Sequence, residues 1–136
     1  MSDLLQDLEN AVKSEDLLQT QEVIEKIKKE TDAFEYIAPM LRLMEENPNL
    51  DFGDPGPMVH FMESYYRKGY EQLLVQSIKR KPTAHTIWML NRILNDPNLS
   101  NRQIYADALN ELTTRTDLDK SVAEAIQMCV SRQNNK

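Results

Sequence analysis

The sequence predicts an all-α fold of about seven or eight helices in a single domain spanning residues 1–136. Apolar side chains recur at three- and four-residue intervals along nearly the whole chain, as they do on the buried face of a helix. Helix-forming Leu, Ile, Met, Glu, Lys and Gln are abundant, and the three glycines are too few for the turns of many short strands. A chain of 136 residues can bury a core without a disulfide or a structural metal.

The first half of the chain predicts three helical segments, which cover residues 4–12, 16–29 and 34–44. The apolar residues of the second segment include Leu17 and Leu18. Pro39 lies inside the third segment and predicts either a kink or a short turn before a helix that starts at Pro39. A long non-helical stretch, residues 47–57, follows and holds three of the six prolines. Within it, Asp54 is expected to cap the next helix, with Pro55 or Pro57 in the first turn.

The second half predicts five more segments, which carry residues 59–66, 70–78, 87–94, 104–112 and 122–129. Thr83 is expected to cap the third of these five segments. Ser100 and Gln103 have the spacing of a capping box and are expected to open the fourth. Asp117 or Asp119 is expected to open the last.

A weak internal repeat points to the way the helices are arranged. Met40-Leu41 precedes Pro48-Asn49-Leu50, and Met89-Leu90 precedes Pro97-Asn98-Leu99, at the same offset of 49 residues. A repeat of this length fits two antiparallel helices per unit, as in HEAT and armadillo proteins. The predicted architecture is therefore an irregular stack of antiparallel helix pairs, which short connections between helices also favour.

The charges are unevenly distributed along the chain. Residues 1–63 hold 15 acidic and 5 basic residues, a net charge of −10, whereas residues 64–92 hold 1 acidic and 6 basic residues. Many of these carboxylates are expected on the solvated faces of helices. Together they repel nucleic acid and anionic lipid and attract basic proteins.

The sequence contains no pattern of residues that assembles an active site, so no enzyme activity, metal or cofactor is predicted. The two histidines, His60 and His85, are 25 residues apart, and the single Cys129 forms no Cys-x-x-Cys pair. Cys129 lies in an apolar helical stretch and is expected to be buried and inert. His60 and Glu63 have the spacing of a base and its orienting partner, but no nucleophile lies near them in the sequence. A hydrogen-bonded pair that shapes the loop, or a contact with a partner protein, is favoured.

One basic and aromatic cluster offers a nucleic-acid interpretation. It consists of Tyr65, Tyr66, Arg67, Lys68, Tyr70, Lys79, Arg80 and Lys81. Such residues can neutralise phosphates and stack on bases, but the acidic first half of the chain opposes a polyanion. Neither nucleic acid nor a membrane is expected as a partner. The N-terminus has no secretory pattern and no long apolar run is present, which predicts a cytoplasmic protein.

Two segments resemble a known class of proteins. Residues 51–63 (DFGDPGPMVHFME) and 86–92 (TIWMLNR) resemble small helical immunity proteins of bacterial contact-dependent growth inhibition and other polymorphic-toxin systems. The resemblance spans roughly residues 35–95. It implies an inhibitor that binds one cognate toxin domain, commonly a basic nuclease, and blocks its active site or substrate path. It transfers no individual site residue.

The sequence therefore predicts an immunity protein that binds a cognate toxin domain and no small-molecule substrate. The residues expected to contact the partner, from charge and loop position, are Glu45, Glu46, Asp51, Asp54, His60, Glu63 and Trp88. Trp88 is the sole tryptophan, and the sequence leaves open whether it is an interface anchor or a core residue. The alternative hypothesis is a generic helical-repeat scaffold that binds a host peptide or subunit.

Overall fold

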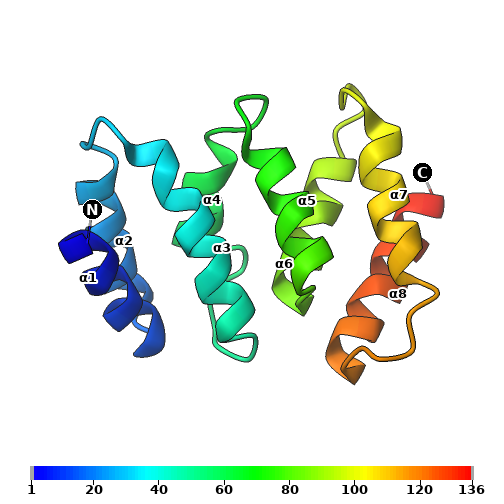
Figure 1. Ribbon diagram of the computed structural model, residues 1–136, viewed down its shortest axis with the longest axis horizontal. Helices are drawn as coiled ribbons and strands as arrows, with labels where there is room; N and C mark the ends of the chain where they lie inside the picture. Colours follow the sequence, from blue (N-terminus) through cyan, green and yellow to red (C-terminus); the bar gives the residue numbers. More distant parts are fainter. Residues whose placement is uncertain (1, 136) are drawn as a thin grey trace. The chain divides into compact units, whose positions relative to one another are not determined.

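The computed structural model describes residues 2–135, with the side chains of residues 3–135, and confirms the all-α class (Figure 1). Eight α-helices and one 3-10 helix, and no strand, lie within the described residues. Contacts divide the chain into two compact units, Met1–Leu73 and Leu74–Lys136, whose boundary falls inside α5. The expectation of a single domain over residues 1–136 stays a prediction.

Unit 1 contains α1 (Ser2–Lys13), α2 (Leu17–Ile27), the 3-10 helix η1 (Ala33–Tyr36), α3 (Ile37–Glu46), α4 (Pro57–Glu63) and the start of α5 (Tyr70–Arg80). Unit 2 contains the rest of α5 and then α6 (Ala84–Leu94), α7 (Arg102–Leu112) and α8 (Lys120–Asn134). In unit 1, α2 packs against α1 and α4. In unit 2, α6, α7 and α8 all pack against one another.

The helices α1 and α2 form an antiparallel hairpin, because only a short turn separates two helices that pack together. Glu15 lies in this turn at a φ of 58°, a left-handed conformation. Asp16 then caps α2, and its Oδ1 accepts the backbone N–H of Gln19 at 3.0 Å. The hairpin buries Leu8 and Ile24 completely. The turn that connects α1 to α2 is therefore fixed by hydrogen bonds and by the core below it.

Pro39 is accommodated without a kink in the middle of a helix. The short 3-10 helix η1 comes first, and α3 begins at Ile37, so that Pro39 lies in the first turn. In a first turn the backbone N–H has no helical acceptor, and its absence from proline removes no hydrogen bond. Of the two predicted alternatives, the structure is closer to a short turn before a helix, but α3 begins at Ile37 and not at Pro39.

The prediction that Asp54 caps α4 is wrong, because Gly56 is the residue that precedes the helix. Gly56 has a φ of 100°, and Pro57 is the first helical residue, one of the two positions expected for a proline. A Cβ at Gly56 would lie 1.7 Å from the carbonyl oxygen of Phe52. Only glycine fits this approach, and it moves the start of α4 beyond the reach of the Asp54 side chain.

Of the three helix starts predicted in unit 2, those at Thr83 and Asp119 are confirmed and that at Ser100 is wrong. Thr83 and Thr86 form a reciprocal capping box at the start of α6, with both N–H···Oγ1 distances 3.1 Å. Ser100 does not open α7. Asn101 takes the N-cap position at a φ of 56°. The guanidinium of Arg102 donates hydrogen bonds back to the carbonyls of Leu94 and Asp96, which fixes the turn one residue later than the pattern predicted.

The two copies of the weak repeat have the same local structure. Met40 and Met89 are both buried, in α3 and α6 respectively. After each helix the chain makes the same turn: Leu50 N–H donates to the Asn47 carbonyl at 3.2 Å, and Leu99 N–H donates to the Asp96 carbonyl at 3.2 Å. The 49-residue echo therefore corresponds to a recurring helix-and-turn element, one in each unit.

Gly56→Ala is expected to destabilise the protein by about 1–3 kcal/mol or more, from the left-handed φ and the clash with the Phe52 carbonyl. Chemical denaturation followed by circular dichroism measures the free energy of unfolding. Asn49→Ala, at an exposed position in the same loop, is the control and should change it by less than about 0.5 kcal/mol. Equal stability of the two variants would mean that the loop does not require glycine.

Candidate functional site

The loop of residues 47–56 holds two of the predicted contact residues, Asp51 and Asp54, on the outside of unit 1. It leaves α3 through a hydrogen bond from the Asn47 side chain to the Leu43 carbonyl at 2.9 Å. Phe52, between the two aspartates, is 4% exposed and anchors the loop in the core. Asp51 and Asp54 are both exposed. The buried ring thus holds the loop, while the carboxylates on either side of it face solvent.

A third carboxylate joins this loop from a distant part of the sequence. The backbone N–H of Asp51 donates to Oε2 of Glu15 at 2.9 Å, which ties the loop to the turn between α1 and α2. The side chain of Asp51 turns back and its Oδ1 accepts the N–H of Gly53 at 2.9 Å. Glu15 and Asp51 are both exposed. The fold therefore places two acidic residues side by side that are 36 positions apart in the chain.

Apolar side chains lie next to these carboxylates. A narrow depression in unit 1 is lined by Val12, Glu15, Leu17, Thr20, Asp51, Phe52 and Met58. Val12, Phe52 and Met58 belong to the core, whereas Leu17 is 36% exposed. The next residue, Leu18, is 73% exposed, more than any other large apolar residue among those described. The acidic loop and the start of α2 thus form one continuous surface of mixed character.

Glu45 does not belong to this exposed acidic surface. It lies on the buried side of α3, and its side chain is 5% exposed. Its Oε1 is 3.8 Å from Nη1 of Arg42, which is 57% exposed. The sequence grouped Glu45 with Glu46 by charge and by position beside the loop, but neighbours on a helix point about 100° apart. The structure accordingly separates the two, and only Glu46 faces solvent.

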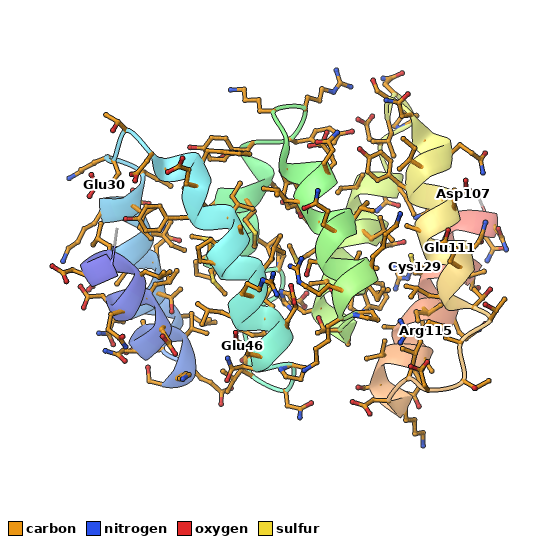
Figure 2. The ribbon with its side chains drawn as sticks, in the orientation of Figure 1. Glu30, Glu46, Asp107, Glu111, Arg115 and Cys129 are labelled. Atoms are coloured by element: carbon orange, nitrogen blue, oxygen red, sulfur yellow. The ribbon has the colours of Figure 1, made fainter. Side chains whose placement is uncertain are left out.

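Glu46 borders a groove between α1 and α3, and Figure 2 labels it at the end of α3. The groove has a volume of about 410 Å³ and is lined by Leu5, Glu9, Ala38, Pro39, Arg42, Leu43 and Glu46. Nζ of Lys13 forms a salt bridge with Oε1 of Glu9 at 2.8 Å. The hydrogen bond and charge of Glu9, and to a smaller extent the charge of Glu46, raise the pKa of Lys13. The charged rim of this groove therefore contains both signs.

His60 and Glu63 both lie on α4, as their spacing predicts. His60 is exposed, and Glu63 is half-buried. Among the described residues, no group of three or more His, Cys, Asp or Glu side chains is arranged to hold a metal ion.

Trp88 lies in unit 2, on α6, and is half-buried. The guanidinium of Arg132 on α8 stacks over its ring, 5.1 Å from the centroid. A cation over an indole face stabilises a contact between two helices and covers part of the ring. Trp88 is therefore neither fully buried nor fully available to a partner.

Two rings of the basic and aromatic cluster, Tyr65 and Tyr70, pack within unit 1. Tyr70 is completely buried, and Tyr65 packs edge-on against Phe34 and Phe61 with centroid distances of 5.3 and 5.5 Å. These two rings are committed to the interior of unit 1 and do not form a platform for bases. Arg67 lies over Tyr66 in unit 1, whereas Lys79, Arg80 and Lys81 belong to unit 2.

Cys129 is completely buried in unit 2, which confirms the expected packing role. Its Sγ–H donates to Oδ1 of Asn91 at 3.5 Å, and the same oxygen accepts a shorter hydrogen bond, 2.7 Å, from Nε2 of Gln133. Burial raises the pKa of the thiol from 9.0 to about 11, against a small opposing contribution from Arg132. Because only the thiolate is a good nucleophile, Cys129 is inert near neutral pH.

The sequence patterns did not identify Glu15, Leu17 and Leu18 as parts of the surface. Glu15 joins it through a contact across 36 residues that no local pattern encodes. Leu18 was detectable, because it lies four and seven residues before Glu22 and Glu25, on the polar side of α2. Leu17, by contrast, shares a face with the buried Ile24.

Comparisons of the chain with protein-family profiles, with curated proteins and with solved structures found no significant match. Within the described residues, no helix has the length and apolar character needed to cross a bilayer.

The raised pKa of Cys129 predicts a loss of stability in alkaline solution. Unfolded protein loses the thiol proton near pH 9.0, while folded protein keeps it up to about pH 11. Above pH 9.0 the unfolded state therefore binds fewer protons, and the free energy of unfolding should fall toward pH 11, by about 1–3 kcal/mol. Denaturation of the wild type and Cys129→Ala at several pH values isolates this contribution, which the variant lacks. Parallel pH curves for the two proteins would contradict the assignment.

Proposed function

We propose that this chain is an immunity protein, a cytoplasmic inhibitor without enzyme activity that binds a basic, nuclease-type toxin domain and occludes its active site. The observation that carries the proposal is the exposed acidic surface of unit 1 around Glu15, Asp51 and Asp54. The resemblance of residues 51–63 and 86–92 to immunity proteins supplies the class of partner.

Within the residues that the structure describes, the carboxylates of this surface are not neutralised. Ion pairs in unit 1 hold Glu9 to Lys13, Glu25 to Lys28 and Glu45 to Arg42. Glu15, Asp51 and Asp54 make no ion pair with any side chain in the described part of the chain. Uncompensated charges of one sign destabilise a fold by mutual repulsion, so their presence on one surface favours a role in binding.

An acidic surface of this kind suits the task of a toxin inhibitor. Charges of one sign speed the encounter with an oppositely charged protein, and a nuclease domain presents basic residues where it binds the phosphates of its substrate. A specific complex requires roughly 800 Å² of buried surface on each partner. Carboxylates that dock on the basic substrate path would exclude the nucleic-acid substrate, because they would pair with the same basic residues of the toxin.

A second candidate function is a helical-repeat scaffold that binds a host peptide or subunit. It is favoured by the recurrence of the same helix and turn at Leu50 and Leu99. Repeat proteins commonly use their helical surfaces for peptides. A toxin reading frame directly adjacent in the genome distinguishes the two functions, because only an immunity protein needs it.

Neutralisation of the toxin domain encoded by that reading frame tests the proposal directly. Co-expression of the chain should restore growth of cells that produce the toxin domain, and the purified proteins should form a stoichiometric complex. Growth arrest despite full expression of both proteins would refute the immunity function.

The complex should also depend on the charge of the loop. Asp51→Lys combined with Asp54→Lys is expected to slow association with the toxin domain roughly tenfold or more at low salt, and to flatten its salt dependence. Stopped-flow measurements over a range of ionic strength give both quantities. Asp51→Asn keeps an oxygen that can accept the Gly53 N–H and separates loss of charge from loss of loop geometry.

Asp107→Lys combined with Glu111→Lys is the matched control. Both residues are exposed on α7 in unit 2, as labelled in Figure 2, and the control changes the net charge by the same amount. It should leave the association rate nearer to that of the wild type than the loop variant does. If both double variants slow association equally, net charge and not the loop steers the partner.

A further inference from the structure

Leu18 is exposed in a way that the packing of α2 does not explain. The helix buries Val23, Ile24 and Ile27 in unit 1, but Leu18 is 73% exposed. Leu17, beside it in the first helical turn, is 36% exposed. An exposed leucine side chain gains little from burial in the fold, and clusters of apolar side chains with a polar rim are typical of interaction sites.

Carboxylates surround these leucines. Glu22 follows Leu18 by four residues on α2, a spacing that brings side chains together on a helix, and Glu15 lines the same depression as Leu17. Asp16 caps the same helical turn, and Asp51 is attached through its hydrogen bond to Glu15. None of these four carboxylates takes part in an ion pair within the described part of the chain.

The surface is held in place before any partner arrives. The backbone N–H of Glu15 donates to the Val12 carbonyl at 3.0 Å, and the Thr20 hydroxyl donates to the Asp16 carbonyl at 2.8 Å. The Asp51–Glu15 hydrogen bond fixes the loop against the same turn. A pre-organised surface loses little conformational entropy when it binds, which improves affinity.

We infer that Leu17, Leu18 and the carboxylates of Glu15, Asp16, Glu22 and Asp51, together the leucine–carboxylate surface, dock a basic polypeptide segment that inserts an apolar side chain between lysines or arginines. Charge complementarity selects this occupant. A second copy of the chain would bring like charges together, and an anionic lipid surface would meet the same repulsion.

The two kinds of side chain have separate roles in this surface. The carboxylates act over a distance and speed the encounter, whereas the leucines act only on contact and slow dissociation. The inference rests on the proposed function only for the identity of the partner. The chemistry of the surface fits a basic segment with an apolar side chain from any protein. In a complex with a toxin domain, this surface would be the apolar anchor.

Short synthetic peptides test the chemistry on the full-length protein. The probe is a peptide of lysine and leucine, and its two controls replace every leucine with serine or every lysine with glutamate. NMR titration of labelled protein should shift the Leu17 and Leu18 methyl resonances and the Glu15 and Asp51 amide resonances with the lysine–leucine peptide. The serine peptide should bind roughly tenfold more weakly, and the glutamate peptide should not bind.

Leu18→Ser is expected to raise the dissociation constant of the lysine–leucine peptide roughly tenfold. Ile104→Ser is the matched control, because Ile104 is 54% exposed and lies three residues before Asp107 on α7. It should leave the dissociation constant unchanged. Thermal melts of both variants verify that they fold.

Shifts centred on Ile104, or equal weakening by both serine variants, would overturn the inference, as would self-association of the protein through Leu18. The outcome is separable from that of the proposed function. If Leu18→Ser neutralises the toxin normally and the lysine–leucine peptide does not bind at the leucine–carboxylate surface, the docking role of this surface is refuted and the immunity function stands. If the peptide binds at this surface but the protein does not neutralise the toxin, the docking role stands and the immunity function is refuted.

Discussion

The arrangement of unit 1 depends on the burial of Phe52, which pins the loop after α3 against the hairpin of α1 and α2. The ring lies with Val12 and Met58 around one depression, and Gly56 lets the chain pass within contact of the Phe52 carbonyl before α4 begins. With the ring fixed, Asp51 can reach Glu15 and the carboxylates on both sides of the ring remain in solvent. An apolar contact therefore determines where the charged groups lie.

The helices were predictable because their apolar periodicity is local, and positions such as Thr83 combine a cap residue with a proline that ends the preceding helix. The errors occurred where the backbone takes a left-handed conformation. Gly56 replaces Asp54, and Asn101 replaces Ser100, because the chain reverses one or two residues later than a side-chain pattern indicates. The candidate surface was predictable only as a group of acids. To identify its apolar part, one must know which face of α2 carries Leu18. To identify Glu15, one must know that two distant segments are in contact.

The two units treat their polar groups differently. In unit 1 the carboxylates of Glu15, Asp51 and Asp54 lie in solvent, whereas in unit 2 the buried Asn91 accepts hydrogen bonds from Cys129 and the half-buried Gln133. Gln133 also donates to Asn95 at 3.1 Å, so that α8 is joined to α6 through two successive turns. Buried polar groups of this kind are costly unless every partner is in register, and they therefore fix how one helix lies along another. In unit 2 polarity contributes to the specificity of packing, and in unit 1 it provides surface charge.

Trp88, whose ring lies under the guanidinium of Arg132, is an intrinsic fluorescence reporter. The chain has one tryptophan, and it lies in unit 2, so emission excited selectively at the indole describes that unit alone. Circular dichroism, in contrast, sums over the helices of both units. If the two signals change together during unfolding, residues 1–73 and 74–136 melt as one cooperative unit. If they change separately, the two parts melt independently.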